Sequence, residues 1–130
     1  KFVFMTDLGE VPEAAMEYCR MADHLIIESN FDLDMLIRGS YAPELKKRIY
    51  EGNGHLSNDQ CAHALKMVLH KDLKSVYLCH LSENNNSPKL AYDCASEAIT
   101  SMGYSLGTDV KLFCLPRREP SPLYTFEERQ

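Results

Sequence analysis

The tripeptide His-Leu-Ser occurs twice in this chain, at residues 55–57 and 80–82. Histidine is the side chain that most readily ligates a metal ion or transfers a proton near neutral pH. Two carboxylates, Asp7 and Glu28, occupy similar settings, each at the end of a short apolar run. Imidazole and carboxylate groups together can bind divalent cations and can perform acid–base chemistry. We therefore ask whether these four side chains belong to one site.

Asp7 and His80 are candidate metal ligands. Each ends an apolar run that predicts a buried strand, KFVFMTD and VYLCH. A carboxylate and an imidazole suit Zn²⁺ or Mn²⁺, and a carboxylate can bridge two such ions. A centre with two ions suits hydrolysis of phosphate esters, because it makes a hydroxide and clamps the attacking and leaving oxygens. Taken singly, an Asp at a strand end is more often a turn residue or helix cap than a ligand, and a His there is more often just a partly buried residue.

His55 lies just before the start of a predicted helix. Ser57 followed by Gln60 is the pattern of a capping box. A helix N-terminus has unpaired N–H groups and partial positive charge, so Ser57 and Asn58 are candidates for binding a phosphate. An imidazole there could donate to the anion or protonate a leaving oxygen. The alternative is that the sequence GNGH forms an ordinary turn.

Strand and helix patterns alternate along the chain, which predicts an α/β fold with a sheet buried under helices. Apolar runs predict strands over 1–7, 24–29, 74–81 and 109–115, and apolar residues at helical spacing predict helices over 11–22, 32–39, 42–51, 57–70 and 87–103. If neighbouring strands are parallel, their ends bring Asp7, Glu28 and His80 to one edge of the sheet.

The composition limits the classes of function. The 130 residues suffice for one domain, and the net charge of −5 does not predict a broad nucleic-acid-binding surface. Five cysteines in apolar segments, without CxxC spacing, predict buried thiols and a cytoplasmic location. We expect no membrane span and no leader peptide. The segment SENNNSPK is expected to form a solvated loop, and residues 116–130 an extended arm.

The segments TDLG, IIESNFD, GHLSNDQCAHAL and VYLCHLSENNN resemble, in this order, the second half of a metallo-β-lactamase-fold hydrolase. The resemblance is to the bacterial WalJ/YycJ-type branch, whose members resemble nucleases, and the layout is similar to that of ribonuclease Z. It implies that Asp7 bridges two metal ions and that His80 is a further ligand. It also implies that His55 lies near the scissile phosphate, where Glu28 hydrogen-bonds it.

The chain departs from this family in one respect. The His-x-His-x-Asp-His signature and another ligand histidine, which precede the Asp in the family, are absent. The resemblance therefore implies that residues 1–115 are the C-terminal half of an αββα sandwich, a mixed sheet covered by helices, with 116–130 as a tail. The missing N-terminal half would pack on an exposed apolar sheet face. Two ligands are too few for a zinc site, so we expect this chain to be inactive alone.

Three functions remain open at this point. The leading hypothesis is a metal-dependent phosphodiesterase or nuclease that acts on nucleic acid with two divalent cations, Zn²⁺ or Mn²⁺. The second is a metallo-hydrolase of small esters or thioesters on the same fold, which the acidic net charge favours mildly. The third is a non-catalytic half-domain that binds a partner through its open sheet face. The family signature upstream of Lys1 would favour the two enzymes.

Overall fold

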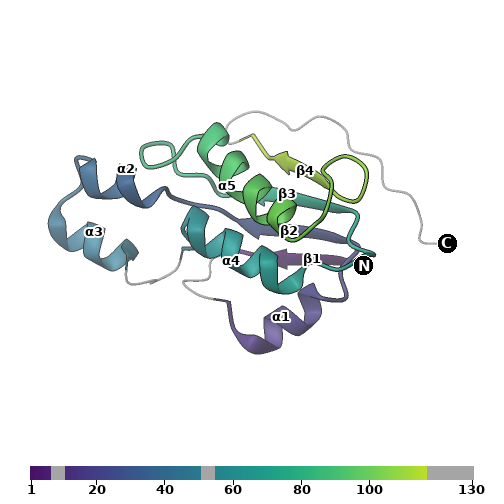
Figure 1. The fold of residues 1–130 in the computed structure, drawn as a ribbon. Helices are drawn as coiled ribbons and strands as arrows, with labels where there is room; N and C mark the ends of the chain where they lie inside the picture. Colours follow the sequence, from purple (N-terminus) through teal and green to yellow (C-terminus); the bar gives the residue numbers. More distant parts are fainter. Residues whose placement is uncertain (7–10, 51–54, 117–130) are drawn as a thin grey trace.

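The structure is a computed structural model that describes residues 1–6, 11–50 and 55–116. Asp7 and most of the predicted arm, residues 117–130, lie outside the described residues. The described part forms four strands and five helices: β1 (Phe2–Met5), α1 (Glu13–Cys19), β2 (His24–Glu28), α2 (Leu33–Arg38), α3 (Pro43–Tyr50), α4 (Asn58–Val68), β3 (Ser75–Cys79), α5 (Pro88–Ser101) and β4 (Lys111–Cys114) (Figure 1). Every predicted strand and helix is confirmed, and most are shorter at their ends than the sequence pattern.

The four strands form one parallel sheet in the order β1-β2-β3-β4. Each strand is joined to the next through at least one helix, which returns the chain to the same end of the sheet. The resemblance implied a mixed sheet, and this is wrong for the described residues, where every strand pair is parallel. Crossovers of one hand that all step in one direction place their helices on one face. Figure 1 shows α1, α4 and α5 on the same side of the sheet.

The hydrophobic core lies between the sheet and these three helices. Leu25, Val76 and Leu112 are paired in register across β2, β3 and β4, and all three are buried against the helices. Leu65 of α4 and Ile99 of α5 are fully buried in the same cluster. Burying a side chain of this size stabilises the fold by about 1.5–3 kcal/mol. The packed helices thus hold the strand ends in fixed positions.

The opposite face of the sheet carries a second apolar row. Phe4, Ile26, Tyr77 and Phe113 are paired in register across the four strands. Tyr77 stacks on Phe113 with 5.1 Å between ring centroids, whereas Phe4 is 67% exposed. Tyr77 in the middle of the row is 5% exposed, so Phe4 at the edge strand is the open position. An exposed aromatic side chain that continues an apolar row is typical of a surface that binds another layer or partner.

Two helices, α4 and α5, begin directly after the capping residues that the sequence predicts. The hydroxyl of Ser57 accepts from the Gln60 N–H at 3.0 Å, and the Gln60 side chain accepts from the Ser57 N–H at 2.8 Å, so the predicted capping box is confirmed. Ser87 caps α5, and Pro88 is its first residue. No helix in the described ranges is long and apolar enough to cross a bilayer.

The cysteines are free thiols in the described part of the chain. Cys19, Cys61 and Cys79 are buried, as predicted, and Cys94 and Cys114 are half-buried. Burial raises the pKa of the Cys61 thiol, and burial also raises that of Cys94 to about 11. Neutral thiols are poor nucleophiles and poor metal ligands. Chemistry at these two cysteines is therefore disfavoured.

Candidate active site around Glu28

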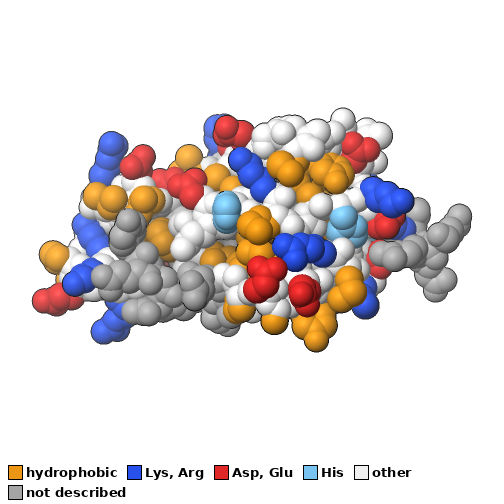
Figure 2. Space-filling model, turned by 60° about the horizontal axis from the view of Figure 1, so that its bottom comes forward, with side chains coloured by type: hydrophobic (Ala, Val, Ile, Leu, Met, Phe, Trp, Pro, Cys, Tyr) orange, Lys and Arg blue, Asp and Glu red, His pale blue; other side chains and the backbone are white. Residues whose placement is uncertain are grey.

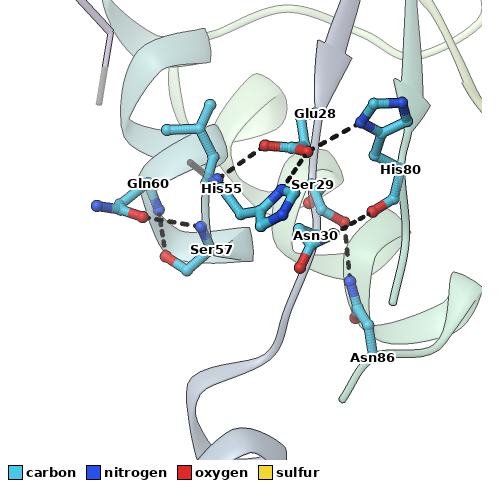
Figure 3. A network of polar contacts seen from close by, with 9 residues as sticks. Glu28, Ser29, Asn30, His55, Ser57, Gln60, His80 and Asn86 are labelled. Carbon is cyan, nitrogen blue, oxygen red and sulfur yellow. Dashed lines mark hydrogen bonds and ion pairs between the residues drawn. The ribbon is translucent and has the colours of Figure 1, made fainter. Parts of the chain in front are cut away.

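Glu28, the last residue of β2, is fully buried and accepts hydrogen bonds from three directions. Its Oε2 accepts from the Leu56 backbone N–H at 3.0 Å. Its Oε1 lies 2.9 Å from Nδ1 of His55 and 3.0 Å from Nδ1 of His80 (Figure 3). A buried carboxylate is costly unless it is paired and hydrogen-bonded. The two His-Leu-Ser elements therefore meet on one carboxylate, which stabilises its buried position.

The shared carboxylate determines which ring nitrogen of each histidine carries the proton. A carboxylate only accepts, so both imidazoles donate to Glu28 from Nδ1–H. In a neutral ring the lone pair is then on Nε2. This orientation is typical of histidines that ligate metals, whose other nitrogen donates to a carboxylate. His55 and His80 have side chains that are 41% and 47% exposed, so their outer ring edges are accessible.

Two features of the backbone bring His80 to this carboxylate: the register of β2 and β3, and the conformation of His80 itself. Glu28 pairs with Cys79 in the parallel register of β2 and β3, and His80 is the next residue. His80 has φ = 55°, in the left-handed region, and among the described residues it is the only residue other than glycine with a positive φ. A left-handed residue costs about 1–2 kcal/mol, so contacts outside the residue must stabilise it.

His55 is positioned by the chain that leads into α4. That chain runs beside the residues that follow β2. The Asn30 N–H donates to the Leu56 carbonyl at 2.8 Å, and the Asn58 N–H donates to the Phe31 carbonyl at 2.8 Å. These bonds, with the capping box, fix the start of α4 against the end of β2. The polar residues after β2 thus form a frame around Glu28.

An open cavity of about 490 Å³ lies in front of the two histidines. It is lined by Asn30, His55, Cys79, His80, Leu81, Leu115 and Pro116. It lies at the carboxyl ends of β2, β3 and β4, where ligands bind in open parallel sheets. Two imidazoles at one edge of this cavity can hold a metal ion, donate to an anion or transfer a proton.

His80 fits the role of a metal ligand because its Nδ1 is held by a carboxylate and its ring borders the cavity. Over residues 1–6, 11–50 and 55–116, however, no three His, Cys, Asp or Glu side chains are grouped to hold a metal ion. The other predicted ligand, Asp7, is outside the described residues. The described part therefore contains one of the two predicted ligands, and the role of His80 as a ligand stays a prediction.

The predicted phosphate-binding residues, Ser57 and Asn58, lie beside His55 but are buried. The Ser57 hydroxyl caps α4. The Asn58 side chain accepts from the Ser29 hydroxyl at 2.6 Å and exchanges hydrogen bonds with the Asn86 amide at 2.8 and 2.9 Å. Both side chains thus have partners within the protein, and their contact with substrate stays a prediction.

Sequence reasoning missed the structural role of the asparagine run. The segment SENNNSPK was expected to be a solvated loop, and this is wrong for Asn85 and Asn86, which are 3% and 5% exposed. The Asn86 amide donates to the Ser29 carbonyl at 2.9 Å, directly after Glu28. Asn86 also binds Asn58 at the start of α4. It therefore joins the ends of β2, α4 and α5 around the site.

Replacing Asn86 by alanine is expected to destabilise the protein by about 2–4 kcal/mol, because buried groups on Ser29 and Asn58 lose their partners. Urea unfolding of the full-length protein measures this change. Asn84→Ala is the matched control, because Asn84 is exposed and its side chain donates to the Tyr41 hydroxyl at a long 3.4 Å. It should change stability by less than about 0.5 kcal/mol. Equal stabilities of the two variants would contradict the network's role.

Comparison with known proteins finds related sequences. No protein-family model matches this chain. The chain is 36% identical to the exodeoxyribonuclease WalJ of Streptococcus pneumoniae over 122 residues, which is 94% of this chain and 45% of that protein. It is 34% identical to the exodeoxyribonuclease YycJ of Bacillus anthracis over 107 residues, 82% of this chain and 40% of that protein. These matches confirm the resemblance to this branch, and the chain spans less than half the length of either relative.

Proposed function

Because this chain is a relative of the WalJ and YycJ exodeoxyribonucleases, we propose that it is part of a metal-dependent exonuclease that hydrolyses phosphodiester bonds in DNA. The observation that carries the proposal is the convergence of His55 and His80 on Glu28 at the edge of a cavity. Two imidazoles held at one edge of a cavity fit phosphoryl chemistry, in which one can hold a metal ion and the other can donate to an anion.

Each residue has a distinct proposed role. As the resemblance implies, His80 and Asp7 would hold the divalent cations, Zn²⁺ or Mn²⁺. Such ions, when bound, supply a nucleophilic water and neutralise charge on the phosphate. His55 faces the scissile phosphate and protonates the leaving oxygen. Glu28 fixes the orientation of His55 through the 2.9 Å contact with its Nδ1.

The remaining ligands are proposed to come from an N-terminal half that carries the family signature. In this proposal the chain is the C-terminal half of a metallo-β-lactamase-type sandwich. The exposed aromatic side chains of β1 support it, since Phe4 of the apolar row is 67% exposed and Phe2, two residues earlier on the same strand, is 48% exposed. Packing a second sheet there would bury these aromatic side chains, as in other sheet-on-sheet cores.

Neither the net charge nor the face drawn in Figure 2 presents a broad basic surface for DNA. Figure 2 shows basic, acidic and apolar side chains interspersed over the face that it presents. The net charge of the chain is −5. Binding of DNA is therefore proposed to depend on cations at the site and on the N-terminal half, because a broad basic surface is the usual source of non-specific affinity.

The test uses the full-length protein that contains this chain. Metal analysis is followed by assays with end-labelled DNA and with a thioester and a small phosphoester, each with Mn²⁺ or Zn²⁺. Release of single nucleotides from DNA ends, abolished by a chelator and restored by metal, is the expected result. Hydrolysis of only the small substrates would favour the second enzyme hypothesis. Inactivity on all substrates would favour the non-catalytic half-domain.

His80→Ala is expected to lower metal content, mainly at one of two sites, because the variant lacks the imidazole that would ligate the ion. Metal equivalents per protein and a Zn²⁺ titration measure this. The control is His63→Ala, since His63 is exposed on α4. A His80 variant that keeps two full equivalents with unchanged affinity would show that His80 is not a ligand.

A further inference from the structure

Asn30 is bonded to both segments that carry the candidate histidines. Its side-chain Nδ2 donates to the carbonyl oxygen of His80 at 2.6 Å (Figure 3). Its backbone N–H donates to the carbonyl of Leu56 at 2.8 Å, and its own carbonyl accepts from the Ser82 N–H at 2.7 Å. One residue therefore connects the chain after β2 with the chain at His55 and with the chain at His80.

The side-chain bond is the unusual one of these three. The two backbone bonds would form with any residue except proline, whereas the bond to the His80 carbonyl needs a short side chain with an N–H donor. That carbonyl belongs to the residue with φ = 55°. A residue other than glycine is strained in the left-handed region, so contacts from outside the residue must stabilise it there. The bond from Asn30 does this by fixing the peptide that follows His80.

The conformation of His80 determines where its imidazole points. Glu28 pairs with Cys79 in the sheet, so His80 leaves the strand immediately beside Glu28. In the left-handed conformation its Nδ1 reaches Oε1 of Glu28 at 3.0 Å. In an ordinary strand conformation successive side chains alternate between faces, and the ring would be directed elsewhere. The contact with Glu28 thus depends on the backbone at His80.

We infer that Asn30 is a positioning residue, which holds His80 in its left-handed conformation and so keeps the imidazole on Glu28 with Nε2 directed away from that carboxylate. The amide of Asn30 neither ligates nor transfers a proton in this role. The inference about geometry stands on the contacts above. Only its consequence for metal binding rests on the proposed function.

A purely structural role for Asn30 predicts a different result. Asn30 is half-buried and lines the cavity, whereas Asn58 and Asn86 are 4% and 5% exposed. If Asn30 served stability alone, its replacement would lower the free energy of unfolding and leave the histidine rings as they are. If it positions His80, the ring of His80 changes its hydrogen bonding even where the fold is intact.

The test uses Asn30→Asp in the full-length protein. Aspartate has the same shape and keeps the backbone bonds, but it places an acceptor opposite the His80 carbonyl. Nitrogen-15 spectra of the imidazoles in metal-free protein report which ring nitrogen carries the proton. We expect His80 to have the Nδ1–H form in the parent protein and to lose it in the variant. A Zn²⁺ titration should show a loss of affinity of about tenfold, the lower end for partners of ligands.

Two further variants make the test decisive. Asn30→Ala removes the donor without adding charge and should give the same change, and it carries the test if the aspartate variant does not fold. Asn84→Ala is the control, since Asn84 is exposed and makes no contact with the histidines. In a Glu28→Gln background, Asn30→Ala should add little to the loss of Zn²⁺ affinity, because the two residues act through one ring.

Unchanged His80 ring signals in both Asn30 variants would overturn the inference. Additive losses of Zn²⁺ affinity in the Glu28→Gln background would overturn it as well. The proposed function fails separately, if the parent protein degrades no DNA and binds no metal. In that case the ring signals still decide whether Asn30 positions His80.

Discussion

Glu28→Gln is expected to slow turnover by about 10²–10⁴-fold and to weaken metal binding by about 10–100-fold in the same variant. The reason is that Glu28 accepts from three donors, two imidazoles at Oε1 and the Leu56 N–H at Oε2. Glutamine has one accepting oxygen and one NH₂ group. With its oxygen at the Oε2 position, glutamine still accepts from the Leu56 N–H, but its NH₂ group then faces both imidazoles, which must accept at Nδ1 and carry their proton on Nε2. With the amide reversed, the NH₂ group faces the Leu56 N–H, which loses its acceptor.

Steady-state kinetics on end-labelled DNA and metal content measured on the same preparation test this prediction. Glu17→Gln is the matched control, because Glu17 is exposed on α1. The resemblance assigned Glu28 to His55 alone, which predicts a milder loss of turnover and intact metal. The contact between Glu28 and His80 adds the loss of metal. A Glu28→Gln protein with its full metal content would show that this contact does not support metal binding.

His55→Ala should slow turnover by about 10²–10⁴-fold while metal content stays nearly unchanged, because a general acid is removed and no ligand is lost. His55 and His80 bond the same carboxylate oxygen. This variant therefore tests whether two histidines with similar contacts have different roles, one in proton transfer and one in metal binding. Kinetics at saturating metal and metal analysis of the purified variant give the two readouts. His63→Ala, on the exposed side of α4, is the control.

The double variant His55→Ala with Glu28→Gln sharpens the assignment. Residues that act as a unit show losses that do not add, so turnover at saturating metal should be little slower than in His55→Ala alone. Metal affinity should fall only through Glu28, since His80 is its other partner. Metal lost from His55→Ala alone would exchange the roles of the two histidines. Turnover close to that of the parent would leave His55 as an ordinary loop residue.

Much of this arrangement could be predicted from the sequence. The periodicity of apolar residues and the caps at Ser57 and Ser87 locate the helices, since both are local signals. The meeting of Glu28 and His80 follows from the assumption that neighbouring strands are parallel, which the structure confirms for β2 and β3. The place of Asp7 and its role as a ligand stay predictions.

The features that could not be predicted depend on partners far apart in the chain. Asn85 and Asn86 are buried because Asp32, Ser29 and Asn58 supply their hydrogen bonds. Nothing within SENNNSPK distinguishes this from a solvated loop. The left-handed conformation of His80 could not be predicted either, because contacts from outside the residue stabilise it. A run of asparagines after a strand is a signal of such a frame only when the facing loops are known.

The arrangement of three donors around Glu28 also has a consequence for how the chain folds. The strands follow their order along the chain, so the sheet can grow one strand at a time. Glu28 and His80 are 52 residues apart, however, and His55 lies between them. A partial fold that ends before β3 leaves this carboxylate on an edge strand in contact with water, so the cost of burying it arises only when β3 docks and His80 supplies the third donor. The buried charge thereby makes docking of β2, β3 and the start of α4 more cooperative than apolar packing alone would.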